Sequence, residues 1–190
     1  MADNSIETLS NRAIHFFQAG NLAEAERVSV QISALHADNF TACYILGLAA
    51  YQRGENAKAL DFLERALAAE PDRAELLTMR GLVLQKSGRL EEALTSLDKA
   101  IRIKPDMVEA HNNRGNTLCD MGRHADALLS YDKAASLQPR YAPTFYNRGV
   151  ALQALGRGAA ELWQGAGDSA QLCRSLEQSR NGPARDEAPG

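Results

Sequence analysis

The sequence repeats itself every 34 residues, and this period restricts the fold more than any other feature of the chain. Two rows of glycines, one row of alanines and one row of prolines all follow the same spacing. Their members are Gly20, Gly54, Gly88, Gly122 and Gly156; Gly47, Gly81, Gly115 and Gly149; Ala25, Ala59, Ala93 and Ala127; and Pro71, Pro105 and Pro139. Independent rows on one period predict a stack of similar units, each packed on its neighbours, in place of a single central core.

Each unit is predicted to hold a pair of helices. The copy from Val108 to Tyr141, VEAHNNRGNTLCDMGRHADALLSYDKAASLQPRY, carries two amphipathic patterns joined at Gly122-Arg123 and closed by Pro139. We expect helices at about positions 2–14 and 17–30 of every copy. The predicted organisation is an N-terminal cap at 1–5, full copies at 6–39, 40–73, 74–107 and 108–141, a partial copy at 142–157 and a divergent tail at 158–190.

The helix ends have their own signals. A short polar side chain followed three residues later by Glu is typical of a capping box. The sequence has this pattern at Asn4–Glu7, Asn21–Glu24, Asp72–Glu75 and Asp106–Glu109. The first glycine row suits a left-handed residue after each first helix, and the prolines should stop the second helices. The first copy has Ala37 at the proline position, so we expect a less rigid turn there.

Residue size indicates how the helices pack. A glycine inside a helix costs roughly 1 kcal/mol relative to alanine, so the glycine row that begins at Gly47 predicts close approach of another helix. We expect the alanine row of the second helices to be its counterpart. Large apolar side chains should fill the seam, and these are Leu46, Leu63, Leu77, Leu84, Leu97, Leu118, Tyr131 and Leu152.

The period and its Gly, Ala and Pro spacing resemble the tetratricopeptide repeat over about residues 6–157. The resemblance implies an all-α, right-handed solenoid of stacked antiparallel helix pairs, whose first helices line a concave groove that binds peptides or other proteins. The family's inward positions carry over to Asn11, Tyr44, Ile45, Leu48, Tyr51, Met79, Leu82, Asn112, Asn113, Asn116 and Asn147. The groove is thus expected to be apolar in copies two and three and rich in amides toward its C-terminal end.

Both kinds of side chain suit an extended peptide. An asparagine amide donates and accepts hydrogen bonds, so a row of them can hold a backbone of any sequence. Apolar Ile45, Met79 and their neighbours can take hydrophobic side chains. The alternative is that Asn112 and Asn113 are only solvated surface residues. Glu7, Glu75 and Glu109 also face inward, but a capping role explains them without a ligand.

The residues that enzymes use are not arranged for chemistry. The histidines do not pair with one another or with cysteine at metal-ligand spacing, and no phosphate-binding or nucleophile motif occurs. We therefore expect a non-enzymatic protein without cofactor or metal. A net charge of -3 without basic clusters argues against nucleic acid, and no apolar run reaches the length of a membrane span. Three cysteines at unrelated spacings and a start without a secretory signal favour the cytoplasm.

Further possibilities stay open for the function and for the tail. The segments Asn112-Asn-Arg-Gly-Asn116 and Tyr146-Asn-Arg-Gly149 resemble the repeat region of O-linked N-acetylglucosamine transferases and their bacterial SPINDLY-like relatives. That resemblance implies, as an alternative, a substrate-docking fragment of a glycosyltransferase without its catalytic domain. The tail at 158–190 loses the period, which indicates either a solvating cap or a truncated or frame-shifted reading of a longer protein. Self-association through this C-terminal end is the other possibility.

Overall fold

The computed structural model describes residues 5–156, and this part of the chain consists of α-helices joined by short turns, without a strand. The helices are α1 (Ile6–Gln18), α2 (Leu22–Leu35), α3 (Phe40–Gln52), α4 (Asn56–Ala69), α5 (Ala74–Lys86), α6 (Leu90–Ile103), α7 (Val108–Asp120), α8 (His124–Leu137) and α9 (Ala142–Ala154). The expected all-α repeat fold is confirmed, with each first helix beginning one residue earlier than predicted. Within residues 5–156, no helix combines the length and the hydropathy needed to cross a membrane. The expectations for the tail and for Asn4 lie outside the described residues.

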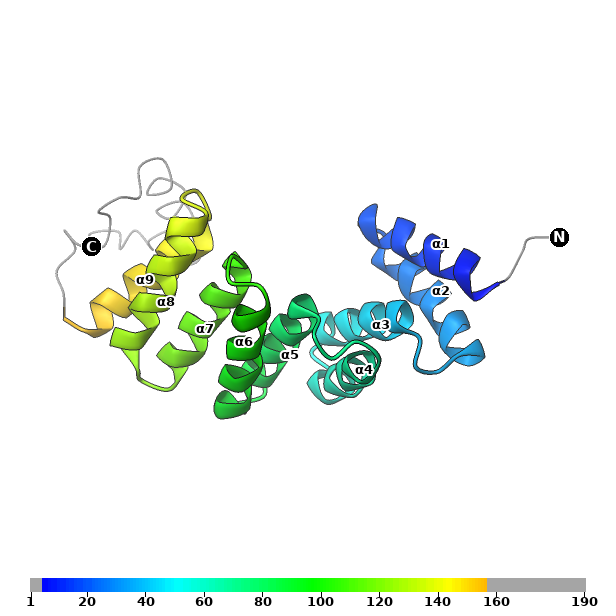
Figure 1. Ribbon diagram of the computed structural model, residues 1–190, viewed down its shortest axis with the longest axis horizontal. Helices are drawn as coiled ribbons and strands as arrows, with labels where there is room; N and C mark the ends of the chain where they lie inside the picture. Colours follow the sequence, from blue (N-terminus) through cyan, green and yellow to red (C-terminus); the bar gives the residue numbers. More distant parts are fainter. Residues whose placement is uncertain (1–4, 157–190) are drawn as a thin grey trace, which may run out of the picture. The chain divides into compact units, whose positions relative to one another are not determined.

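The chain divides into two compact units, Met1–Pro105 and Asp106–Gly190. The first unit contains α1 to α6, drawn from blue to green in Figure 1. Within it each first helix packs on the second helix of its own copy, while α2 also contacts α3 and α4 contacts α5. In the second unit α8 lies against both α7 and α9. Each copy therefore packs on the next copy of its own unit, as a repeat array requires.

The turns inside the helix pairs follow the first glycine row. Gly54 has a φ of 75°, and the other members of this row also have positive φ. The Gly54 amide donates to the Tyr51 carbonyl and the Glu55 amide to the Ala50 carbonyl, both at 2.9 Å. These two bonds satisfy carbonyls that the helix end would leave unpaired. The predicted glycine cap is thus confirmed.

The predicted helix starts are only partly right. Asn21 caps α2, and its side chain accepts from the Glu24 amide at 3.3 Å. Asn39 caps α3 by accepting from the Ala42 amide at 3.1 Å, which was not predicted. The capping boxes expected at Asp72 and Asp106 are wrong, because the residues at the caps are Arg73 and Met107 and neither makes a side-chain cap bond.

The second glycine row allows close packing, and its predicted counterpart is partly right: the Ala59 carbonyl oxygen would lie 3.5 Å from a Cβ on Gly47, but a leucine atom lies closer. A Cβ added to Gly47 would stand 3.3 Å from Leu63 Cγ, and one on Gly81 only 2.6 Å from Leu97 Cγ. The glycines therefore make room for the large residues four positions beyond the alanines. The alanine row is fully buried within the core, and every predicted seam residue is buried.

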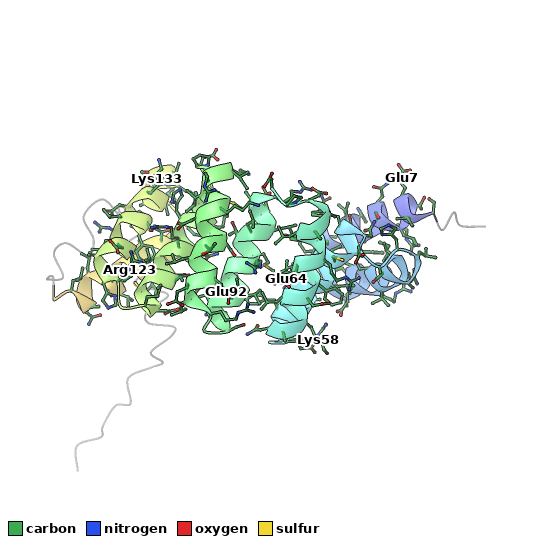
Figure 2. All side chains as sticks on the ribbon, turned by 60° about the horizontal axis from the view of Figure 1, so that its bottom comes forward. Glu7, Lys58, Glu64, Glu92, Arg123 and Lys133 are labelled. Atoms are coloured by element: carbon green, nitrogen blue, oxygen red, sulfur yellow. The ribbon has the colours of Figure 1, made fainter. Side chains whose placement is uncertain are left out.

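In the first unit, a polar link joins the third copy to the second. Arg80 Nη1 donates to Ser96 Oγ at 2.7 Å, and Arg80 Nη2 lies 3.3 Å from Glu64 Oε1 in the preceding copy. Figure 2 shows Glu64 on α4 and Glu92 on α6. In the second unit Arg148 Nε donates to Asp132 Oδ1 at 2.7 Å. The arginine at position 7 thus joins a copy to an acid of the copy before it.

The junction of the first two copies lacks that link. The positions of Arg80, Ser96 and Glu64 are held there by Leu46, Phe62 and Val30. These three residues line a hollow of about 420 Å³. Val30 is 55% exposed there. A different arginine joins the copies here, because Arg53 Nη1 donates to both carboxylate oxygens of Glu26, each at 2.8 Å.

A basic side chain also fastens the turn between copies. Arg65 donates to the Ala37 carbonyl and, through Nε, to Asp38 Oδ1 at 2.9 Å. One copy later Lys99 Nζ donates to the Pro71 carbonyl at 2.8 Å. The turn that lacks a proline is therefore held by a guanidinium that bonds two of its groups.

Candidate functional site

The first helices of the first unit border a hollow of about 290 Å³, which we call the inner hollow. Its walls come from the C-terminal half of α1, the N-terminal half of α3 and the start of α5. The lining residues are Ile14, Phe17, Gln18, Phe40, Thr41, Tyr44, Ile45, Arg73, Glu75 and Leu76. Most of these side chains are apolar or aromatic, which is typical of a pocket that takes a hydrophobic group.

Three aromatic rings build the wall. The Phe17 and Tyr44 rings meet edge to face with centroids 5.8 Å apart. The Phe40 and Tyr44 rings are parallel, with centroids 6.3 Å apart. These rings belong to α1 and α3, so the close contact of these helices in consecutive copies creates the wall.

Charged groups stand at the rim. The Arg73 guanidinium carbon lies 4.7 Å from the centroid of the Phe40 ring, a cation–π arrangement. Glu75 pairs with Lys104 at 3.2 Å. The Glu75 carboxylate accepts from its own backbone amide and from Lys104, and these bonds lower its pKa. Burial raises the pKa of the Tyr44 hydroxyl, and the nearby Glu75 carboxylate adds to the effect. At neutral pH the rim therefore offers a neutral phenol beside an ionised carboxylate.

The amide-rich part of the predicted groove lies in the second unit and is largely engaged. Asn112 is only 5% exposed. Its Oδ1 accepts from Thr144 Oγ1 and from Asn147 Nδ2, each at 3.3 Å, so it joins α7 to α9. Asn116 Oδ1 accepts from the Tyr131 hydroxyl at 2.8 Å. The prediction that Asn112 faces a peptide is therefore wrong, since its buried amide bonds within the unit.

The remaining predicted residues are divided between the hollow and its surroundings. Tyr44 and Ile45 line the inner hollow. Tyr51 and Met79 are partly buried against the core, and Leu48 and Leu82 are also partly buried. Asn11 is exposed, while Asn113 and Asn147 are partly exposed. The role of these residues in binding stays a prediction.

Sequence reasoning missed most of the inner hollow. It selected fixed repeat positions, whereas the hollow arises where one pair of copies carries unusual residues. Phe40 stands at position 1, where the other copies have Ile, Ala or Val, and Phe17 is an aromatic residue at position 12 of the first copy. Aromatic residues gathered in neighbouring copies were the signal in the sequence.

Comparison with protein families identifies the repeats. A model described as TPR repeat matches residues 81–122 and 115–156, and one described as tetratricopeptide repeat matches residues 16–83. The matches run from residue 16 to residue 156. The chain belongs to the tetratricopeptide-repeat family. These TPR matches concern the repeat itself, and they give no support to the resemblance to glycosyltransferase repeats.

Solved TPR structures share the fold. A crystal structure of MamA superposes with a TM-score of 0.72 at 18% identity, covering 87% of this chain and 97% of that one. A structure described as "YrrB: a TPR protein with an unusual peptide-binding site" has a TM-score of 0.70 at 24% identity, with 93% of each chain covered. A comparison with curated protein sequences finds no match. The fold is therefore shared with TPR proteins that differ widely in sequence.

Proposed function

We propose that the protein is a non-catalytic scaffold that binds a partner protein by taking a bulky apolar side chain of an extended segment into the inner hollow. The observation that carries this proposal is the wall of three aromatic rings around an open hollow of about 290 Å³. This volume is near the lower end of ligand pockets, which run from about 300 to 1,000 Å³, and it suits one or two side chains better than a cofactor.

The rim supports the binding of a peptide backbone. Gln18, Thr41 and Tyr44 place an amide and two hydroxyl groups around the apolar wall, and each can donate and accept. A segment anchored by one side chain can thus bond its neighbouring peptide groups to this rim. YrrB, which shares the fold, is described as having a peptide-binding site, and this agrees with the proposal.

A pair of charge substitutions tests the site. Ile14 lines the inner hollow and is 39% exposed, whereas Leu129 is 69% exposed on α8 and is not among the lining residues. The full chain and both variants, Ile14→Arg and Leu129→Arg, are applied to an array of immobilised peptides that vary in one central side chain. We expect the unchanged protein to select large apolar centres and Ile14→Arg to lose this selection. Leu129→Arg should retain it.

The test has a clear contrary outcome. Thermal unfolding of both variants first establishes that each remains folded. If folded Ile14→Arg selects the same peptides as the unchanged chain, the inner hollow is not the binding site. If no peptide with an apolar centre binds the unchanged chain, the proposal itself is wrong.

A further inference from the structure

We propose that the segment bound at the inner hollow carries an acidic side chain next to its apolar anchor, and that Arg73 selects it. This inference rests on the proposed function and adds the charge of the partner. It depends on two charged residues that line the hollow, Arg73 and Glu75, and on the ion pairs that they make with Glu70 and Lys104.

Arg73 is positioned for a second carboxylate. Its guanidinium lies over the Phe40 ring, with 4.7 Å from the carbon to the ring centroid, at the edge of the aromatic wall. Glu70 pairs with Nε at 2.7 Å, and the Arg73 side chain remains 48% exposed. A guanidinium has five N–H donors in a planar fork, so one contact at Nε leaves donors for another carboxylate. Stacking on Phe40 also holds the fork in place, which reduces the entropy lost on binding.

Glu75 is less able to select a basic residue. Its carboxylate already accepts from its own backbone amide and from Lys104, and the Lys104 ammonium stands 3.2 Å away. A lysine or arginine of the partner would have to displace Lys104 or share the carboxylate with it. Such a cation would also lie near the Arg73 guanidinium, which lines the same hollow. Like charges repel, so a basic neighbour of the anchor is disfavoured.

The partner chemistry that follows is a large apolar residue with Asp or Glu beside it. The acid is a side chain of the segment and not its terminal carboxylate. The Arg73 donors lie beside the aromatic wall where the anchor enters, so they are in reach of the residue next to the anchor.

The experiment uses the full chain and short synthetic peptides of glycine and serine with one central leucine, phenylalanine or tryptophan. The residue next to the centre is Asp, Asn or Lys, and both ends are blocked. Affinities are measured by fluorescence anisotropy. We expect Asp peptides to bind about three to ten times more tightly than Asn peptides, and Lys peptides to bind most weakly. A further set of peptides has Asn beside the anchor and a free terminal carboxylate. These peptides test whether the terminal carboxylate binds in place of an acidic side chain.

Two variants report on Arg73 directly. Arg73→Gln removes the cation and leaves Glu70 and Glu75 near the anchor. The order of affinities should therefore reverse, and Lys peptides should bind better than Asp peptides. Glu70→Gln removes the resident partner of Arg73 and should increase the preference for Asp. A loss of stability alone would weaken all peptides equally, and it would not reverse their order.

The outcomes separate this inference from the proposed function. Binding that depends on the anchor but is equal for Asp, Asn and Lys would overturn the inference and leave the scaffold proposal intact. A preference for Lys in the unchanged chain, or for the free terminal carboxylate over the internal Asp, would also overturn it. Absence of any anchor-dependent binding would overturn both.

Discussion

The Tyr131 ring lies against Gly115 so closely that a Cβ on Gly115 would stand 2.7 Å from Tyr131 Cδ1. The ring has little freedom to move away, because its hydroxyl donates to Oδ1 of Asn116, on the same helix as Gly115, at 2.8 Å and the residue is 1% exposed. We predict that Gly115→Ala lowers the free energy of unfolding by about 1–3 kcal/mol through overpacking, despite the better helix propensity of alanine. Urea unfolding measures this change.

Gly47→Ala is the matched control for that substitution. Its Cβ would stand 3.3 Å from Leu63 Cγ, and a leucine side chain can give way more easily than a bonded ring. The propensity gain of about 1 kcal/mol should then offset most of the strain. Equal destabilisation by both substitutions would contradict the argument.

The Tyr131 hydroxyl predicts a dependence of stability on alkaline pH. Burial, followed by the contact with Cys119, raises the pKa of Tyr131 well above its ordinary value of 10.0. Above pH 10 the unfolded chain loses a proton that the folded chain keeps, so stability falls by up to about 1.4 kcal/mol per pH unit from this group. Tyr131→Phe should be less stable at pH 8 but should lose stability less steeply above pH 10. Parallel curves for the two proteins would show that Tyr131 does not cause the loss.

Asn112 and Asn113 are neighbours in sequence, but only the substitution of Asn112 is expected to lower the stability appreciably. Asn112→Ala removes the acceptor for Thr144 and Asn147, and the buried Thr144 hydroxyl loses this partner, so we expect a loss of about 1–3 kcal/mol. Asn113 is partly exposed, and Asn113→Ala should change stability by less than about 0.5 kcal/mol. Hydrogen exchange should show faster opening of α9 in Asn112→Ala only.

The turn between the first two copies depends on Arg65. Arg65→Gln keeps part of the side-chain volume but removes the charge that meets Asp38 and most of the donors, so we expect a loss of about 1 kcal/mol. Arg65→Lys should recover much of this, because Lys99 makes the same contact in the next copy. Thermal unfolding compares the two variants. Equal melting temperatures for both would count against a stabilising role for the Arg65 contacts in this turn.

Helix capping separates the correct part of the sequence prediction from the incorrect part. Asn39→Ala removes a bond to the Ala42 amide and should cost about 1 kcal/mol. Asp106→Ala should cost much less, because α7 begins at Val108 with Met107 as its cap. A larger effect of Asp106→Ala in urea unfolding would mean that the predicted capping box forms after all.

The sequence alone predicted the helix pairs, the left-handed glycines and the buried seam, because these features recur in every copy. It failed at the helix starts after Asp72 and Asp106, where the chain continues one residue beyond the acid before it turns into the helix. It also paired Gly81 with Ala93, whereas the residue above the glycine is Leu97. Position along a helix gives the face of a residue but not the direction in which a long side chain leans.

The inner hollow was harder to predict for a related reason. Tyr44 and Ile45 were selected from inward positions, but Phe40 is the first residue of α3, Arg73 precedes α5, and neither belongs to a recurring row. Asn112 was misassigned because its amide pairs with Thr144, which is 32 residues away in the chain. Such pairs between copies depend on how consecutive first helices approach each other, and the pattern within a single copy does not contain that information.

The two junctions of the first unit use different arginines, Arg53 with Glu26 at the first and Arg80 with Glu64 at the second. An array that grew only by duplicating one gene segment would have interchangeable copies, yet Arg80 needs an acid before it and the first copy offers Val30 at that place. A chain that joined the third copy directly to the first would have Val30 in place of Glu64, so Arg80 would keep its bond to Ser96 and lose its acidic partner. The copies are therefore not interchangeable, although the loss of one exposed pair should lower the stability by no more than about 1 kcal/mol.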